Sequence, residues 1–187
     1  MQAVAARGAA KPGAYFAETG LDFAELFQHY YPRVYNYLRY RVDSPEAAED
    51  LTSVTFERAF AHRAKFDAAK GAFSTWLFRI AHNTLANYHR TRQRRMAHEA
   101  EGGVPLETTL PDLSPEAQVI QVEAITRLLQ GLRHLSGRDQ EVISLKFAAE
   151  LSNREIGQIM ELSEKTVSVV LWRAMQRLQQ HLKGAVT

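Results

Sequence analysis

The sequence predicts an all-α protein of two small helical domains joined by a flexible linker, with a helix-turn-helix in the second domain. Three observations predict this fold class. Apolar residues recur every three or four positions almost throughout, as on the buried face of a helix, and no segment shows the alternation of a strand. Residues 101–115 break this pattern with two glycines and three prolines, the composition of a linker. The last 36 residues hold two helical patterns in close succession.

Composition excludes several classes of protein. With 187 residues, of which 45% are hydrophobic, the chain can bury one modest core or two small ones. Without cysteine it has no disulfide, no thiolate metal site and no thiol nucleophile, which suits a reducing cytosol. No run approaches the roughly 20 apolar residues of a membrane span, and the N-terminal residues lack the apolar stretch of a secretory signal. We therefore expect a cytoplasmic protein without membrane insertion, with a disordered tail over residues 1–20.

The first half of the chain predicts a series of helices. Residues 23–38 place apolar side chains at helical spacing. Ser44 and Pro45 supply the N-cap and the first-turn proline of a further helix, whose early acidic residues suit the positive end of the helix dipole. A loop around Gly71 follows, and Ser74 is placed to cap the next helix.

The helix after Ser74 carries the strongest functional signal, because residues 79–95 contain five arginines and no carboxylate. At about 100° per residue, one face is apolar and points at a core; it holds Leu77, Ile80, Ala81, Thr84, Leu85 and Tyr88. The opposite face, called the stripe below, consists of Trp76, Arg79, Asn83, Asn87, Arg90 and Arg94. An aromatic ring can stack on a base, an amide can pair with a base edge and arginine can neutralise a phosphate, so the stripe predicts nucleic-acid binding.

A solvated helix is the alternative explanation of this segment. Arginines near the C-terminal end of a helix complement its dipole. This effect explains one or two of the five arginines, and it explains neither asparagine.

An acidic segment separates the two halves of the chain. Residues 99–123 contain six acidic side chains and no lysine or arginine. We expect an acidic linker over residues 96–115 and a second domain over residues 116–187. This segregation matters because the net charge of the whole chain is only +2, so that any binding of nucleic acid must depend on local charge.

The C-terminal residues predict a helix-turn-helix. Ser152 and Glu155 have the spacing of a capping box, and Ser163 is placed to cap a longer amphipathic helix. Only Glu161 and Leu162 separate the first helix from that cap, so the two helices must turn sharply against each other. An ordinary helical hairpin is the alternative.

The sequence contains no catalytic or metal-binding constellation. His82 and His89 lie seven residues apart without a third ligand nearby, and we expect both to be hydrogen-bonded in the fold or to face DNA. Neither a nucleophile motif nor a glycine-rich phosphate loop occurs. We therefore expect a protein that is not an enzyme and that uses no metal and no cofactor.

Nearly the whole chain resembles a known family. The stretches FAELFQHYYPRVYNYLRYRV, SPEAAEDLTSVTFERAF and FDAAKGAFSTWLFRIAHNTLANYHRTRQRR resemble the sigma-2 domain of bacterial sigma-70-type factors, in particular the small extracytoplasmic-function (ECF) group. The stretch LRHLSGRDQEVISLKFAAELSNREIGQIMELSEKTVSVVLWRAMQRL resembles the matching sigma-4 domain. The resemblance covers residues 21–182 in the order of the group. It assigns residues 21–95 to a sigma-2 domain and residues 116–187 to a sigma-4 helix-turn-helix domain.

The resemblance implies a factor for transcription initiation. Such a chain binds core RNA polymerase at the beta-prime coiled coil and the beta flap, directs it to promoters and helps to open the DNA. Its partners are core polymerase, promoter DNA and an anti-sigma factor. A free chain of this group can hide its DNA-binding faces by packing its two domains together or onto an inhibitor.

The resemblance also assigns roles to individual residues. Residues matching the reader of the minus-ten element are Phe66, Lys70, Trp76, Arg79, Asn83, Asn87, Tyr88, Arg90, Arg94 and Arg95. Residues matching the reader of the minus-thirty-five element are Arg154, Ser163, Lys165, Thr166, Ser168, Val169, Trp172 and Arg173. Residues matching the contact with the polymerase coiled coil are Asp50, Leu51 and Phe56.

The chain departs from the pattern of the group at three places. Ser53 and Val54 stand where Gln-Glu is usual, and Glu161 stands where the turn of the helix-turn-helix usually has glycine. Residues 168–170 read Ser-Val-Val in place of Lys-Ser-Arg, which means fewer phosphate contacts. Val169 can touch a thymine methyl group, and an exposed pair of Val169 and Trp172 also suits a partner protein.

Two alternatives to a sigma factor remain. The segment LSNREIGQIMELSEKTV also resembles the DNA-binding domain of LuxR-type regulators, which bind DNA alone as dimers. Such a regulator would carry a receiver or ligand-sensing domain with strands, and the first half of this chain has no strand pattern. A purely helical adaptor without DNA function would leave the stripe unexplained.

Overall fold

The computed structural model describes residues 22–98 and 127–184, and all regular structure in these residues is helical, as the sequence predicts. The elements are α2 (Phe23–Arg39), α3 (Pro45–His62), the 3-10 turn η1 (Arg63–Lys65), α4 (Phe73–His98), α6 (Gly137–Ile143), the π-helical turn η2 (Ser144–Ala148), α7 (Asn153–Met160) and α8 (Glu164–Gly184). Residues 127–133 are helical as well. The predicted tail, residues 99–115 of the predicted linker and the start of the predicted second domain lie outside the described residues.

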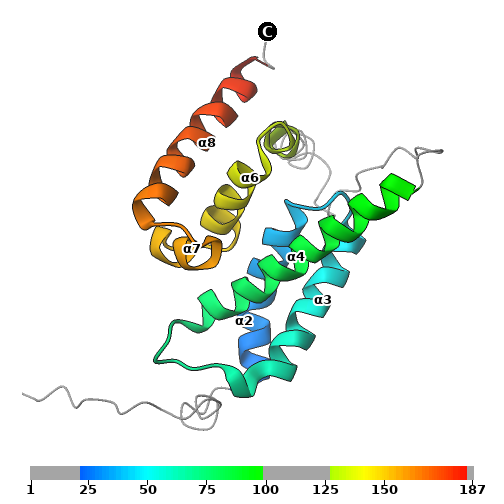
Figure 1. The fold of residues 1–187 in the computed structure, drawn as a ribbon, viewed down its shortest axis with the longest axis vertical. Helices are drawn as coiled ribbons and strands as arrows, with labels where there is room; N and C mark the ends of the chain where they lie inside the picture. The colour runs from blue at the N-terminus through cyan, green and yellow to red at the C-terminus, as the bar shows by residue number, and fades with distance from the viewer. Residues whose placement is uncertain (1–21, 99–126, 185–187) are drawn as a thin grey trace, which may run out of the picture.

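Helices α2, α3 and α4 pack into a bundle (Figure 1). The Asp22 carboxylate caps α2 by accepting from the Ala24 N–H at 3.3 Å. Ser44 caps α3 by accepting from the Ala47 N–H at 3.2 Å, and Pro45 is the first residue of the helix. These contacts confirm the predicted start of α3, and they fix which of its residues face the core.

The cap predicted for α4 is wrong. The helix begins at Phe73, two residues before a helix capped by Ser74 would begin. The Ser74 hydroxyl donates instead to Glu155 of α7 at 2.8 Å. Ser74 therefore lies in the first turn and connects α4 to the second half of the chain. At its other end α4 continues to His98, beyond the predicted domain boundary at residue 95.

Helices α7 and α8 form the predicted helix-turn-helix. Ser152 and Glu155 make both hydrogen bonds of the predicted capping box. The Ser163 hydroxyl accepts from the Thr166 N–H at 3.1 Å at the start of α8. Between the helices Glu161 takes the left-handed conformation (φ 56°, ψ 43°). The turn is thus made without glycine, at a cost of about 1–2 kcal/mol.

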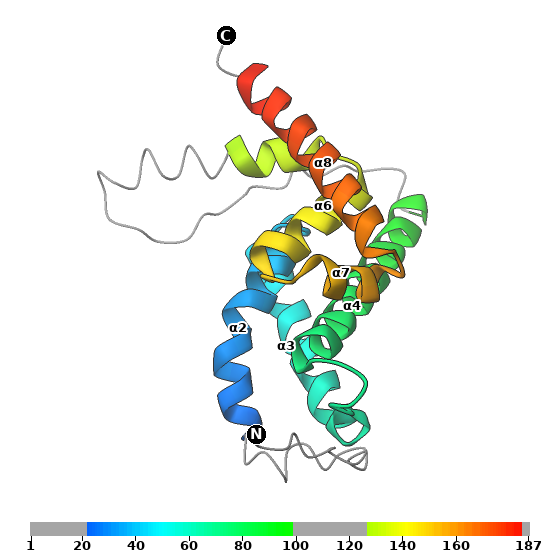
Figure 2. The ribbon, with the colours of Figure 1, turned by 90° about the vertical axis from the view of Figure 1, so that its left-hand side faces the viewer.

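The two halves of the chain share one hydrophobic core. Both views show α6 and α7 lying against the bundle (Figures 1 and 2). Leu77 and Phe78 of α4 belong to the same buried cluster as Leu145 and Ile156 of the second half. A smaller cluster within the second half consists of Leu132, Leu135, Ile143, Ala174 and Leu178. The described parts of the two domains therefore pack together, as the resemblance implies for a free chain.

Helix α4 buries two faces and exposes a third. Leu77 and Ala81 lie on the predicted apolar face and are fully buried. Thr75, Phe78 and His82 lie on a second face, where Phe78 is fully buried and the other two side chains contact the second half of the chain. The third face is the stripe. The sequence pattern predicts the first and third faces but not the second.

Alanine at Gly157 tests the close approach inside the helix-turn-helix. A Cβ atom at this position would lie 2.6 Å from the backbone carbonyl oxygen of Leu162, in the turn before α8. We expect Gly157→Ala to lower the free energy of unfolding by about 2 kcal/mol, because the turn must shift to admit the methyl group. Urea denaturation followed by circular dichroism measures this change.

Gly137→Ala is the matched control for this substitution. An added Cβ at Gly137, the first residue of α6, has no heavy atom within 4 Å. We expect its free energy of unfolding to stay the same or to rise slightly, because alanine favours the helix. Equal losses in both variants would contradict the close approach at Gly157.

Candidate nucleic-acid interface

The stripe of α4 faces solvent over most of its length. Arg79, Asn83, Arg90 and Arg94 are exposed, and Asn87 is half-buried. The guanidinium of Arg90 donates to the side-chain oxygen of Asn87 at 2.5 Å. The structure thus brings guanidinium and amide groups together on one side of one helix, as the sequence predicts.

Trp76 lies at the N-terminal end of the stripe, half-buried in an aromatic cluster. Its ring centroid is 5.4 Å from that of Phe66 and 5.5 Å from that of Phe73. Phe66 is only 2% exposed, so in this conformation its ring anchors the loop before α4 and is not open to a base. Lys70 of the same loop is exposed, and its ammonium lies 3.6 Å from the Asp67 carboxylate. Of the two loop residues assigned to DNA, only Lys70 is at the surface.

A basic groove of about 470 Å³ continues the stripe between α3 and α4. Its lining residues are Leu51, Val54, Arg58, Thr84, Asn87, Tyr88, Thr91, Arg92 and Arg95. Arg58 of α3 donates to the Thr84 hydroxyl at 3.0 Å, which orients its guanidinium. Arg92 pairs with Asp43, whereas Arg95 is exposed. Arg58 was not predicted, because it lies on another helix and no periodicity connects it with the stripe.

The second half of the chain contacts the beginning of α4. Arg79 donates to the backbone carbonyl of Gln158 in α7 at 2.9 Å. Ser74 and Thr75 donate to the Glu155 carboxylate at 2.8 and 3.2 Å. Figure 2 shows α7 beside this part of α4. A DNA strand that binds Arg79 competes with this hydrogen bond to α7.

Helix α8 and its surroundings present the residues assigned to the minus-thirty-five element. The exposed members of this set are Arg154, Ser163, Lys165, Ser168, Val169, Trp172 and Arg173. Thr166 is half-buried, and its hydroxyl lies 2.7 Å from that of Ser163, so both residues already serve the start of the helix. Trp172 is 64% exposed and Val169 is 41% exposed. An apolar pair therefore stands open on the outer face of α8.

The residues assigned to polymerase binding divide between surface and core. Asp50 is exposed on α3. Leu51 and Phe56 are 9% and 4% exposed and belong to the shared core. In this conformation the two apolar side chains hold α3 in the bundle, and Asp50 alone is at the surface for a partner.

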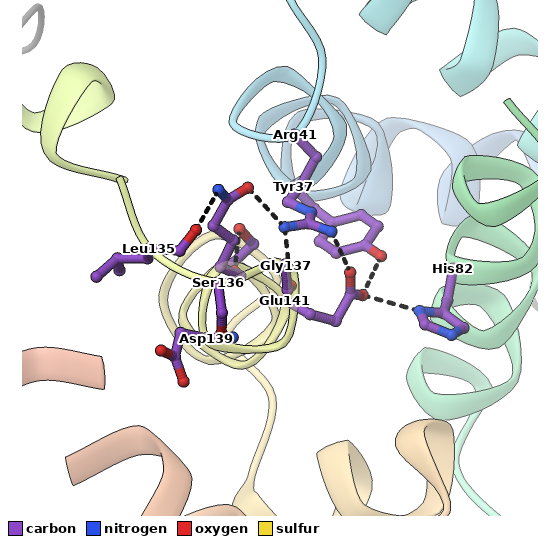
Figure 3. Close-up of polar contacts among 10 residues, drawn as sticks. Tyr37, Arg41, His82, Leu135, Ser136, Gly137, Asp139 and Glu141 are labelled. Carbon is purple, nitrogen blue, oxygen red and sulfur yellow. Dashed lines mark hydrogen bonds and ion pairs between the residues drawn. The ribbon is translucent and has the colours of Figure 1, made fainter. Parts of the chain in front are cut away.

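A buried polar cluster joins the two halves of the chain, as Figure 3 shows. Glu141 of α6 is 5% exposed and accepts from the Tyr37 hydroxyl at 2.5 Å. The same oxygen lies 2.8 Å from Nδ1 of His82, and the other lies 3.0 Å from the Arg41 guanidinium. These four residues are called the Glu141 cluster below. One carboxylate of the second half thus contacts three parts of the bundle: α4, the C-terminal end of α2 and the loop that follows α2.

Ionisation of the cluster follows from its contacts. Burial by itself would raise the pKa of Glu141, but the hydrogen bond from His82, the charge of Arg41 and the hydrogen bond from Tyr37 lower this pKa below its ordinary value of 4.5. Burial, followed by the charge of Glu141, raises the pKa of Tyr37 well above 10.0. At neutral pH the carboxylate is therefore ionised and the Tyr37 hydroxyl keeps its proton to donate.

The expectation of a hydrogen-bonded histidine is confirmed for His82, which belongs to the Glu141 cluster. His89 is half-buried, and its ring centroid lies 5.5 Å from that of Tyr88. Residues 22–98 and 127–184 contain no group of three or more acidic or histidine side chains placed to hold a metal ion. Within the same ranges, every helix is too short or too polar to traverse a lipid bilayer.

Both halves of the chain match known protein families. Residues 26–95 match the family Sigma-70 region 2, and residues 131–180 match Sigma-70, region 4. The chain is 33% identical over 156 residues to the ECF RNA polymerase sigma factor BldN of Streptomyces coelicolor. The matched region covers 83% of this chain and 58% of BldN. It is 32% identical over 158 residues to the RNA polymerase sigma factor YlaC of Bacillus subtilis. Here the matched region covers 84% of this chain and 90% of YlaC.

The fold also has a solved counterpart. It is similar to the sigma factor RpoE from Bartonella quintana, whose structure was determined in complex with the anti-sigma factor NepR. The TM-score is 0.72 at 24% sequence identity, over 87% of this chain and 97% of that one.

A helical bundle with a basic stripe, followed by a helix-turn-helix, defines the class: a helical DNA-binding protein. The chain belongs to the sigma-70 family of RNA polymerase sigma factors, in its extracytoplasmic-function group. The LuxR-type alternative has no support, because residues 26–95 match a sigma-70 region and not a sensing domain. The family matches also exclude a purely helical adaptor without DNA function.

Acid should weaken the contact between the two halves. The pKa of Glu141 is lower in the folded chain than its ordinary 4.5, so its contribution to stability is complete above that value and is lost as the pH falls through the folded pKa. We expect the free energy of unfolding to fall more steeply in the wild-type chain than in Glu141→Gln between about pH 5 and about pH 3. Urea denaturation at each pH measures both slopes, and equal slopes would exclude a contribution from Glu141.

Proposed function

We propose that the chain directs core RNA polymerase to promoters and helps to open the DNA, with α4 binding the separated strand of the minus-ten element. The observation that carries this proposal is the stripe, which places Trp76, Asn83 and Arg94 along one side of α4. Taking a base out of the duplex costs a few kcal/mol, which contacts with aromatic rings and amides can offset. The stripe offers both kinds of group, followed by arginines for the phosphates.

The side chains of α4 divide this work by their chemistry. Asn83 and Asn87 each offer a donor and an acceptor to a base edge. Arg90, Arg94 and the exposed Arg95 lie farther along the helix and suit the phosphates of the same strand. The arginines that line the groove between α3 and α4 add further positive charge beside the stripe.

Helix α8 suits the major groove of the minus-thirty-five element. In a helix-turn-helix, the first residues of the second helix reach the base edges. Lys165 stands at this position, with Val169 and Trp172 following on the exposed face. Val169 suits a thymine methyl group, and Arg173 suits a phosphate.

The partners follow from the same surfaces. Asp50 on α3 supports a contact with the beta-prime coiled coil of core polymerase, and the second half supports one with the beta flap. The exposed apolar pair of Val169 and Trp172 also suits an anti-sigma factor. In this proposal the chain is a binding protein and not an enzyme, and it acts in the cytoplasm beside the polymerase.

Substitutions in the stripe test the assignment to the minus-ten element. Transcription by core polymerase with this chain from a promoter library, followed by sequencing of the transcript starts, first identifies the promoter. We expect Asn83→Ala to weaken binding of the minus-ten strand by the chain bound to polymerase by about 1–3 kcal/mol, through the lost base contact. We expect Arg94→Gln to reduce the slope of log affinity against log salt concentration for the same binding. The reduction should correspond to the loss of about one phosphate contact. Fluorescence anisotropy at several salt concentrations measures both effects.

Gln93→Ala is the matched control for the stripe. Gln93 is exposed in the same part of α4 but lies off the stripe. We expect its affinity and its salt dependence to equal those of the wild-type chain. A loss as large as that of Asn83→Ala would contradict recognition through the stripe.

Trp172→Ala tests the outer face of α8. We expect about tenfold weaker binding of a minus-thirty-five duplex by the chain with core polymerase, because the indole loses its contact with the groove. Stability should change by less than about 0.5 kcal/mol, since the side chain is exposed. Gln180→Ala, an exposed position farther along α8, is the control. Unchanged DNA binding in Trp172→Ala would remove this residue from the DNA contact and leave it to a partner protein.

A further inference from the structure

We propose that Glu141 is a latch that holds the free chain closed, and that its release from Tyr37, Arg41 and His82 frees Arg79 at the start of the stripe. Here "closed" means the arrangement in which the second half packs against the bundle. The consequence for DNA rests on the proposed function, whereas the latch itself concerns only the contact between the two halves.

The closed chain cannot engage both promoter elements at once. Elements at positions minus ten and minus thirty-five lie about 25 base pairs apart, which is about 85 Å along B-DNA. Helix α4 has 26 residues and α8 has 21, so their lengths are about 39 and about 32 Å. Even end to end the two helices would span only about 70 Å, and α7 packs against both of them. The two halves must therefore separate before both helices contact one promoter.

Arg41 shows how closely the closed arrangement depends on α6. Its guanidinium lies 3.0 Å from the Glu141 carboxylate and donates to the Gly137 carbonyl at 3.2 Å and to the Gln140 side chain at 2.9 Å. All three partners belong to α6 (Figure 3). The side chains of Arg41 and Glu141 are 9% and 6% exposed, so closure removes both charges from water together.

The Glu141–Arg41 pair differs from an ordinary contact because both of its members are buried ions. When the chain opens, both ions regain their hydration, which offsets part of the attraction that is lost. A closed chain that lacks one partner would instead bury an uncompensated charge, which is strongly unfavourable. The shared apolar core also favours closure, so loss of either partner does not remove this packing, but it shifts the chain toward the open state.

The latch is coupled to the stripe through α4. His82, a member of the Glu141 cluster, lies one turn of helix after Arg79. While the cluster is intact, α7 stays over the start of α4, with Arg79 bound to the Gln158 carbonyl. Opening frees this arginine and the first turn of the helix together. The closed chain thus keeps Arg79 of its proposed minus-ten surface hydrogen-bonded to its own helix-turn-helix.

The distance between the two halves tests the latch directly. The chain has no cysteine, so spin labels can be placed on Gln28→Cys in α2 and Gln179→Cys in α8, both at exposed positions. Pulsed electron spin resonance on the full chain then gives the distance distribution. We expect a single short distance in the wild-type background. In Glu141→Gln we expect longer distances, with the ratio of closed to open chains reduced at least about a hundredfold.

Asp139→Asn is the matched control. Asp139 is also on α6 and is 4% exposed, but its partner Arg177 belongs to the same half of the chain. This variant should keep the short distance, with its helix content checked by circular dichroism. Unchanged distances in Glu141→Gln, or equal opening in Asp139→Asn, would overturn the latch.

A double variant tests the pairing itself. Arg41→Gln with Glu141→Gln removes both charges, so no ion is left uncompensated in the closed chain. We expect the ratio of closed to open chains to recover at least about tenfold relative to Glu141→Gln alone. No recovery would mean that Glu141 acts other than through Arg41, and the latch as stated would be wrong.

A pool of random single-stranded DNA separates the latch from the proposed function. If Glu141→Gln moves the labels apart and the free chain binds the pool more tightly by about tenfold or more, the latch and its effect on the stripe are both supported. If the labels move apart without a gain in affinity, the latch is supported and the assignment of the stripe to DNA is contradicted.

Discussion

The structure depends on the burial of α4 on two sides at once. Leu77 and Ala81 face the bundle, while Phe78 and His82 face the side that closes against α2 and the second half of the chain. Each packed neighbour occupies about a third of the circumference of a helix, so two neighbours leave one strip for solvent. That strip must be polar, and here it consists of amides and guanidinium groups. The stripe, which we propose as a recognition surface, is therefore the part of α4 that packing leaves exposed.

The contact between the two halves combines apolar packing with buried polar groups. Leu145 and Ile156 extend the core of the bundle, and Arg33 donates to the Ala149 carbonyl beside them. A wholly apolar contact of this kind would resist opening in proportion to its area. Buried ions act differently, since they require a matched partner when closed and regain hydration when open. Such a contact selects one closed arrangement without making it permanent.

The two proposed recognition surfaces differ in their contacts within the closed chain. Arg79 is bound to α7, and Trp76 lies half-buried among aromatic rings. Lys165 and Trp172 on α8 remain exposed. Closure therefore engages Arg79 of the stripe and leaves these residues of α8 open. The groove with Arg58 stays open beyond this contact.

By itself the sequence determined what depends on local chemistry: the helices, the caps at Ser44 and Ser152, the helix-turn-helix and the stripe. These features follow from spacing along a single helix, which the order of residues contains directly. Only the tertiary structure decided the role of Ser74, which bonds to α7 instead of capping α4, and that of Glu141. A carboxylate on a helix has the same local pattern whether it faces water or a buried guanidinium. Which one it meets depends on how distant segments pack, and local periodicity does not encode this choice.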